Sequence, residues 1–135
     1  MRFCVGTSSI PPTYSNKYLT DTEYCLYFHS GKGKVHPSCY DDGKTFYVSG
    51  TSFEGKELGH PNAKPLEFVK RMVSNSSEKG GLVFDPFMGS GTTGVACKEL
   101  GRNFIGCEIN PDYFKIAEER ISGTSYSGKS FTKLF

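Results

Sequence analysis

A glycine-rich segment with an acidic residue on each side is the part of this sequence best suited to bind a ligand. Residues 89–94 read Gly-Ser-Gly-Thr-Thr-Gly and follow the apolar run at residues 82–84. This is the G-x-G-x-x-G pattern, whose glycines let the backbone approach a ligand closely between a strand and a helix. Glu108 ends the next predicted strand, where a carboxylate accepts hydrogen bonds from two ribose hydroxyls. The alternative is a tight strand-to-helix turn without a ligand.

Asp85 separates the cofactors that could fit such a loop. It stands between the apolar run and the glycines. The diphosphate of a dinucleotide would be repelled there, whereas a cationic ammonium group would donate a charge-assisted hydrogen bond. S-adenosylmethionine carries that ammonium group and a ribose, so it fits both carboxylates. The alternative for Asp85, and for Glu108, is a helix cap or turn former.

A second glycine-rich pattern, at residues 123–130, matches the P-loop letter for letter but lacks its context. A P-loop lies between a buried strand and a helix, whereas this segment follows a predicted helix and is followed only by residues 131–135. Nucleotide hydrolysis at this segment is therefore not expected.

The elements that must position the glycine loop form a strand, turn, helix, strand unit. Residues 82–84 are wholly apolar, which is typical of a strand buried on both faces. Ser90 or Thr92 is expected to cap the following helix, and Gly101 to end it. Residues 103–107 then form the second strand, so the unit is a βαβ motif.

The sequence predicts the remaining elements less strongly. Residues 1–20 lack either hydrophobic period and predict an extended arm, and the polar residues 122–135 predict a flexible tail. A single domain, complete or incomplete, is expected between them at residues 21–121. Its other predicted elements are a strand at 23–28, a weak strand at 45–48, a helix at 66–74 and a helix at 111–121.

Composition limits the class of protein without identifying a partner. The 135 residues suffice for one domain, and the net charge of +2 is too small to indicate a nucleic-acid binder by itself. No apolar run is long enough to span a membrane and the first residues build no secretory signal, so a soluble, cytoplasmic protein is expected. The five cysteines form no C-x-x-C pair, and no metal site is predicted.

Several segments together resemble the cofactor-binding half of the amino-group DNA methyltransferases, which methylate adenine N6 or cytosine N4. The resemblance is carried by residues 85–93, 100–111 and 117–121, and by the H-P-x-x-K-P element at residues 60–65. It is strongest over residues 59–121 and indicates the class whose cofactor motif follows its catalytic motif. It implies an α/β fold, a partial Rossmann-like S-adenosylmethionine-dependent methyltransferase fold whose antiparallel edge comes from the aromatic strands before Phe53.

The resemblance also implies roles for individual residues. Asp85 would face the methionine ammonium group, Glu108 would hold the ribose, and Lys64 would lie beside the methionine carboxylate. Thr92 and Thr93 would reach that carboxylate with hydroxyls and backbone N–H groups, and Phe87 would pack on the cofactor or fill the core. The complete set of expected cofactor-binding residues is Asp85, Phe87, Gly89, Ser90, Gly91, Thr92, Thr93, Glu108, His60, Lys64 and Pro65.

The sequence departs from the family at the catalytic tetrapeptide, which is Asp, Asn or Ser followed by Pro-Pro and an aromatic residue. Its acceptors bind the exocyclic amine while its ring stacks on the flipped base. The nearest segment here is Ile10-Pro11-Pro12-Thr13, which has neither an acceptor nor a ring in register and is interpreted as a loop. No catalytic residue is therefore assigned.

The hypothesis that follows is a site-specific DNA methyltransferase of a restriction-modification system, truncated or split. DNA is then the partner, together with a second chain or an upstream segment that supplies the catalytic loop. The alternatives are a non-catalytic subunit that binds cofactor or DNA, and a nicotinamide-dependent oxidoreductase, against which Asp85 argues.

Overall fold

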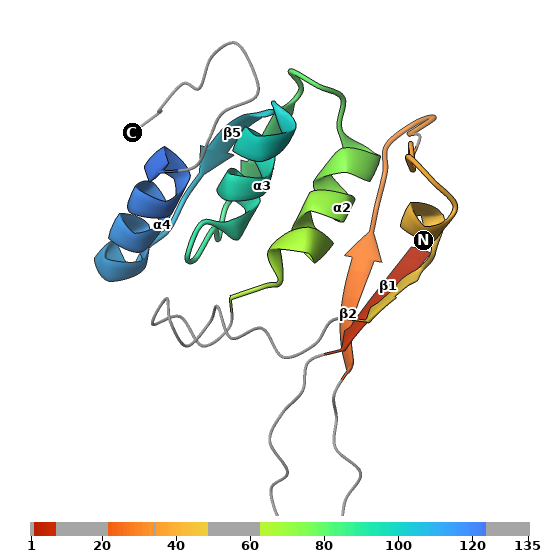
Figure 1. The fold of residues 1–135 in the computed structure, drawn as a ribbon, viewed down its shortest axis with the longest axis horizontal. Helices are drawn as coiled ribbons and strands as arrows, with labels where there is room; N and C mark the ends of the chain where they lie inside the picture. The colour runs from red at the N-terminus through yellow and green to blue at the C-terminus, as the bar shows by residue number, and fades with distance from the viewer. Residues whose placement is uncertain (1, 8–21, 34, 49–62, 124–135) are drawn as a thin grey trace, which may run out of the picture.

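The computed structural model describes residues 2–7, 22–33, 35–48 and 63–123, which form two sheets and three α-helices (Figure 1). The first sheet has the order β2-β1-β3, with β1 at Arg2–Thr7, β2 at Thr22–Tyr27 and β3 at Phe46–Val48. In it, β1 is antiparallel to β2 and parallel to β3. The second sheet pairs β4, Leu82–Asp85, with β5, Asn103–Gly106, in parallel.

The prediction that residues 1–20 form an arm without regular structure is wrong for β1. This strand pairs along its whole length with β2, from Arg2 opposite Tyr27 to Thr7 opposite Thr22. Its backbone partners are distant in sequence, so a local reading of residue types does not reveal them. Residues 8–20, including Pro11 and Pro12, and the tail from residue 124 lie outside the described residues.

The aromatic strands do not form an edge of the β4–β5 sheet in the described part of the chain. They belong to the separate first sheet, and helix α2, Leu66–Ser76, lies between the two sheets in Figure 1. On one side, the ring of Phe68 lies 5.3 Å from that of Tyr47 in β3. On the other side, Lys70 Nζ lies 3.0 Å from Glu99 of the following helix, which connects the two helices by an ion pair. Helix α2 therefore contacts the first sheet on one side and, on the other, the helix that connects β4 and β5.

The βαβ unit and the helices agree with the sequence, apart from one cap. Helix α3 spans Thr92–Leu100 and α4 spans Pro111–Gly123, so residues 122 and 123, predicted to begin the flexible tail, are helical. Gly101 ends α3 in the left-handed region, with its N–H bonded to the carbonyl of Lys98 and that of Arg102 bonded to the carbonyl of Cys97. The prediction that Ser90 or Thr92 caps α3 is wrong, because the cap position is Gly91 and no side chain bonds to the free N–H groups there.

The main hydrophobic core lies between α3 and its neighbours. Apolar residues of α3 pack against Phe104 of β5, Ala117 and Ile121 of α4, and Val73 of α2. Cys97 is fully buried at its centre, and this desolvation raises the pKa of its thiol to about 12. The thiol is therefore a neutral packing group at physiological pH. Within the described residues, no helix is long and apolar enough to cross a membrane.

One face of the β4–β5 sheet remains open, contrary to the expectation that residues 82–84 are buried on both faces. Val83 packs against the core, while Leu82 is 63% and Phe84 is 59% exposed. Successive side chains of a strand point to opposite faces, so the helices cover only the face of Val83 and Phe104. No described element covers the other face.

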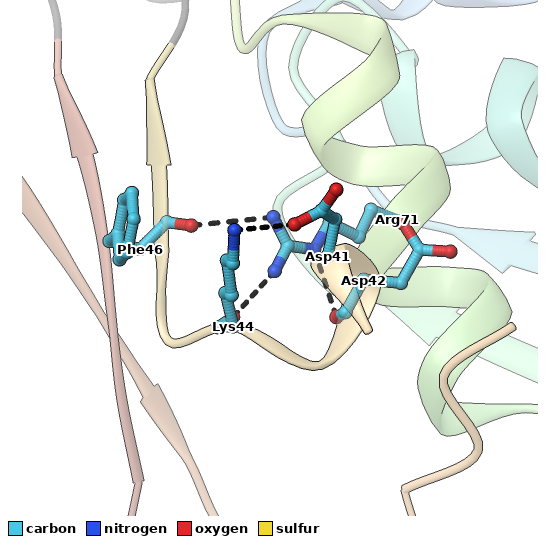
Figure 2. Close-up of polar contacts among 5 residues, drawn as sticks. All are labelled: Asp41, Asp42, Lys44, Phe46 and Arg71. Carbon is cyan, nitrogen blue, oxygen red and sulfur yellow. Dashed lines mark hydrogen bonds and ion pairs between the residues drawn. The ribbon is translucent and has the colours of Figure 1, made fainter. Parts of the chain in front are cut away.

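Arg71 of α2 holds the segment between the short 3-10 helix η1, Asp41–Gly43, and strand β3 (Figure 2). Its guanidinium group donates hydrogen bonds to the carbonyl oxygens of Asp42 at 3.0 Å, Lys44 at 2.5 Å and Phe46 at 3.3 Å. Asn75, one helical turn later, donates a second hydrogen bond to the Asp42 carbonyl at 2.7 Å. Side chains of helix α2 thus bind the backbone between η1 and β3.

We expect Arg71→Met to destabilise the protein, because the Lys44 and Phe46 carbonyls lose the Arg71 donor, the Asp42 carbonyl keeps only that of Asn75, and methionine supplies none. Leaving partly buried polar groups without a hydrogen bond costs about 1–3 kcal/mol. The free energy of unfolding from urea titration measures this loss. Lys115→Met is a matched control, since Lys115 is exposed on α4 and surface substitutions usually change stability by about 0.5 kcal/mol or less. Equal unfolding midpoints for the two variants would contradict the role of Arg71.

Candidate functional site

The candidate site lies where the carboxyl ends of β4 and β5 meet. The strands are parallel and Asp85 is paired with Gly106, so the chain leaves both strands at the same edge of the sheet. The glycine loop leaves β4 and leads into α3, and the loop after β5 leads into α4. Figure 1 shows that α2, α3 and α4 all begin on the same side of the molecule. Ligands of open α/β sheets bind at such an edge.

Asp85 is held rigidly at this edge by two hydrogen bonds from the glycine loop and α3. Its Oδ1 accepts the backbone N–H of Phe87 at 3.0 Å, and its Oδ2 accepts the hydroxyl of Thr93 at 2.7 Å. The carboxylate is half-buried. Because each carboxylate oxygen has two lone pairs and accepts one of these bonds, the group retains acceptor capacity for a ligand.

Glu108 connects the two loops of the edge. Its Oε2 accepts the N–H of Gly89 at 2.9 Å, and its Oε1 accepts the N–H of Asn110 at 2.9 Å. Asn110 in turn accepts the N–H groups of Asp112 and Tyr113 and so caps α4. Both predicted carboxylates therefore lie at the same sheet edge, each fixed by a backbone N–H group.

The glycines of the loop are required by the fold itself. Gly89 and Gly91 have φ values of 52° and 78°, in the left-handed region that favours glycine. A Cβ on Gly91 would lie 2.8 Å from the Cβ of Ala117, and a Cβ on Gly94 would overlap Ile121 and Phe104. Close packing of α3 against α4 and β5 therefore explains Gly91 and Gly94 without a ligand.

Arg120 of α4 binds the glycine loop through hydrogen bonds. The sequence indicates only a basic residue in the last turn of a helix, not this contact. Nη1 of Arg120 donates hydrogen bonds to the Ser90 carbonyl at 2.6 Å and hydroxyl at 3.1 Å, and to the Thr92 hydroxyl at 3.3 Å. Ser90 and Thr92 are only 3% and 5% exposed. The hydroxyls of Ser90 and Thr92 bind Arg120 rather than a ligand, whereas the hydroxyl of Thr93 contacts Asp85.

Two exposed apolar side chains flank the carboxylates. Phe87 follows Asp85 by two positions and is 87% exposed, so it does not fill the core. Ile109 directly follows Glu108 and is 99% exposed. Ile109 is not among the residues predicted from the sequence, although an apolar residue in the loop immediately after the acid was a usable signal. Large apolar groups exposed beside polar ones are a common feature of ligand sites.

The other expected residues lie at the beginning of α2 or outside the described residues. Lys64 is exposed and Pro65 is half-buried, directly before the helix, and His60 falls in a segment that is not described. A hollow of about 500 Å³ lies elsewhere, between α2 and η1. Among its charged groups, Lys70 pairs with Glu67 and Arg71 donates to the Asp42 carbonyl. In the described ranges no three potential metal ligands cluster.

Comparison of the sequence with protein families gives a match to the DNA methylase family over residues 8–119. A type II methyltransferase of Streptococcus pneumoniae, M2.DpnII, is 47% identical over 123 residues, covering 82% of this chain and 46% of that protein. M.HpaI of Haemophilus parainfluenzae, also a type II methyltransferase, is 47% identical over 62 residues, which is 46% of this chain and 20% of that protein. The chain thus spans less than half the length of these relatives.

Solved structures show the same similarity. The M1.HpyAVI complex with S-adenosylmethionine superposes with a TM-score of 0.78 and 34% identity, covering 90% of this chain and 61% of that chain. The PvuII cytosine-N4-specific DNA methyltransferase gives a TM-score of 0.67 at 19% identity, covering 88% of this chain and 50% of that chain, which shows a shared fold alone. The expected partial Rossmann-like methyltransferase fold is confirmed.

Proposed function

Because the chain belongs to the N6/N4 DNA methylase family, we propose that it is the cofactor-binding portion of a DNA methyltransferase and binds S-adenosylmethionine at the β4–β5 edge. The observation that carries this proposal is the pair of carboxylates, Asp85 and Glu108, fixed by backbone N–H groups at one edge of a parallel sheet. A cationic ligand with a ribose matches this set of acceptors, whereas a diphosphate does not.

The methionine end of the cofactor is assigned to Asp85 and the loop that begins α3. Asp85 accepts a hydrogen bond from the ammonium group, and Thr93 holds Asp85 in the required orientation. The first N–H groups of α3 have no side-chain cap, so they are placed to donate to the methionine carboxylate. Lys64 adds a positive charge at the beginning of α2, and His60 and Pro65 belong to the same proposed element.

The adenosine end is assigned to Glu108 and the exposed apolar residues beside it. Glu108 accepts hydrogen bonds from the ribose hydroxyls, with its orientation set by Gly89 and Asn110. Ile109 and Phe87 supply apolar surface on which the adenine ring packs. Both side chains are exposed in the protein alone, and contact with the ring would cover them. The backbone of Gly89, Ser90, Gly91 and Thr92 completes the loop around the ligand.

The proposed reaction is methylation of an adenine N6 or cytosine N4 amine in DNA. S-adenosylmethionine supplies the methyl group when bound. The residues of this chain bind and orient the cofactor, while the acceptors for the target amine come from a Pro-Pro tetrapeptide outside this sequence. This assignment rests on the type II methyltransferases to which the chain is similar. A methylation assay on unmodified DNA tests it, and transfer by this chain alone would contradict the division of roles.

Calorimetric titration with S-adenosylmethionine tests the cofactor assignment directly. We expect one molecule to bind per chain, and we expect reduced nicotinamide dinucleotide not to bind. A sample whose circular dichroism shows folded helices and strands but which binds no S-adenosylmethionine would overturn the proposal.

We expect Glu108→Gln to lower the affinity for S-adenosylmethionine about tenfold or more. The amide keeps the shape of the carboxylate but turns one of its two acceptor oxygens into a donor, which loses a hydrogen bond to a charged group worth about 1.5–3 kcal/mol. Calorimetry measures the change. Glu119→Gln is the matched control, because Glu119 is exposed on α4 away from the loop, and its affinity should equal that of the unmodified chain. Equal losses in both variants would contradict the role of Glu108.

A further inference from the structure

The β4–β5 sheet has an open face, formed by Leu82, Phe84 and Ile105, which is unusual for a parallel sheet. Parallel strands occur almost only where both faces are covered. Here Leu82 is 63% and Phe84 is 59% exposed, and Ile105, paired with Phe84 on the same face, is half-buried. Helices cover the opposite face, where Val83 and Phe104 pack. A contiguous apolar face of this kind marks an interaction site.

The outer edge of β4 is unpaired within the described residues. Strand β5 uses the carbonyl groups of Gly81 and Asp85, which accept the N–H groups of Asn103 at 2.8 Å and Cys107 at 3.0 Å. Peptide groups alternate along a strand, so those of Leu82 and Phe84 point to the other edge. The sheet order is β4-β5, and no described strand lies on that side. The open face and the unpaired edge thus belong to the same strand.

We infer that this edge and face bind the portion of an N6/N4 methyltransferase that the sequence does not include. The binding takes place between two chains, with that portion supplied as a separate polypeptide. The inference rests on the proposed function and names its partner. A strand of that portion pairs with Leu82 and Phe84, and apolar side chains cover the open face.

Two observations favour this partner over a second copy of the chain. The M1.HpyAVI structure superposes on 90% of this chain but on only 61% of its own length, so more than a third of that protein lies beyond the common part. The Streptococcus relative likewise matches over 46% of its length. A remainder of that size is large enough to supply both a strand and a covering layer. A second copy would bring the same open face and leave the remainder unmatched.

Co-expression of the full chain with a tagged polypeptide tests the inference. The polypeptide is the portion of M2.DpnII outside its match to this chain. We expect the two to purify as a one-to-one complex and to elute together on size exclusion. In the complex, the amide protons of Leu82 and Phe84 should exchange with solvent at least tenfold more slowly than in the chain alone, because the edge becomes paired.

Leu82→Asp and Phe84→Ser identify the surface. Each side chain is largely exposed, so neither substitution removes core packing, and each variant should keep its helical circular dichroism and its affinity for S-adenosylmethionine. Recovery of the complex should fall at least tenfold. Tyr40→Ser is the matched control, since Tyr40 is 86% exposed ahead of η1, and its recovery should be unchanged.

Three results would overturn the inference: undiminished recovery with Leu82→Asp, unchanged exchange of the two amides in the complex, or a homodimer through this face that excludes the added polypeptide. These results are independent of the cofactor titration. A chain that binds S-adenosylmethionine but not the polypeptide contradicts the docking surface alone. A chain that binds the polypeptide but no cofactor contradicts the proposed function alone.

Discussion

Asp85→Asn should lower the affinity for S-adenosylmethionine by about 10- to 100-fold while leaving the affinity for 5′-methylthioadenosine within about twofold. The second ligand has the adenosine and thioether parts but neither the ammonium nor the carboxylate group. A charge-assisted hydrogen bond contributes about 1.5–3 kcal/mol, and asparagine removes the charge without changing the size of the side chain. The selectivity between the two ligands therefore reports on the ammonium contact.

Titration calorimetry with both ligands on both proteins makes this measurement. Asp112→Asn is the matched control, because Asp112 is an exposed acid in the first turn of α4, and it should bind both ligands as the unmodified chain does. An equal loss of both ligands in Asp85→Asn would show that the substitution disturbs the glycine loop as a whole, through the bonds to Phe87 and Thr93. Unchanged binding of S-adenosylmethionine would remove the proposed contact.

Gly91→Ala should clearly lower the free energy of unfolding, because two separate costs add at this position. The backbone there has a φ of 78°, which costs a residue with a Cβ about 1–2 kcal/mol. The new Cβ would also lie 2.8 Å from the Cβ and 3.0 Å from the Cα of Ala117. Backbone cannot turn away as a side chain can, so α4 must shift, and overpacking of this kind costs about a further 1–3 kcal/mol.

Gly80→Ala separates the two causes. Gly80 has a φ of 79°, nearly the same as Gly91, but a Cβ there would meet no atom within 4 Å. Its loss of stability, measured by urea unfolding, should therefore be about 1–2 kcal/mol and reflect the backbone alone. We expect Gly91→Ala to exceed Gly80→Ala clearly and also to weaken cofactor binding. Equal losses would mean that α3 and α4 are not packed as closely as the structure has them.

The part of the fold that the sequence predicted is the part specified by local residues. Gly101 ends α3 through its left-handed conformation, and Pro111 opens α4 directly after the cap at Asn110. Apolar positions at helical spacing place α2, which runs two residues past its expected end at Ser74. Strand β1 was missed because it exists through pairing with Thr22–Tyr27, and nothing within Arg2–Thr7 specifies that partner.

The candidate site shows the same division. Asp85 and Glu108 were predicted from their positions after two strands, and both lie at the shared edge. The inward direction of Ser90 and Thr92 was not predicted, because it depends on Arg120, which is 30 and 28 positions away from them, respectively. Arg71 was missed for the same reason, since its three acceptors are backbone carbonyls that any sequence provides.

The way the two sheets are connected also has a consequence for the order in which they form. Leu82 of β4 pairs with Asn103, 21 positions later, and α3 fills the interval. Val5 of β1 pairs with Phe46, 41 positions later. Closing the longer loop costs about 0.6 kcal/mol more in chain entropy, and contacts between distant residues form more slowly than local ones. We therefore expect the βαβ unit to form before β3 joins the first sheet. In pulsed hydrogen exchange, protection of the Asn103 amide, which donates to the Gly81 carbonyl, should precede protection of the β3 amides.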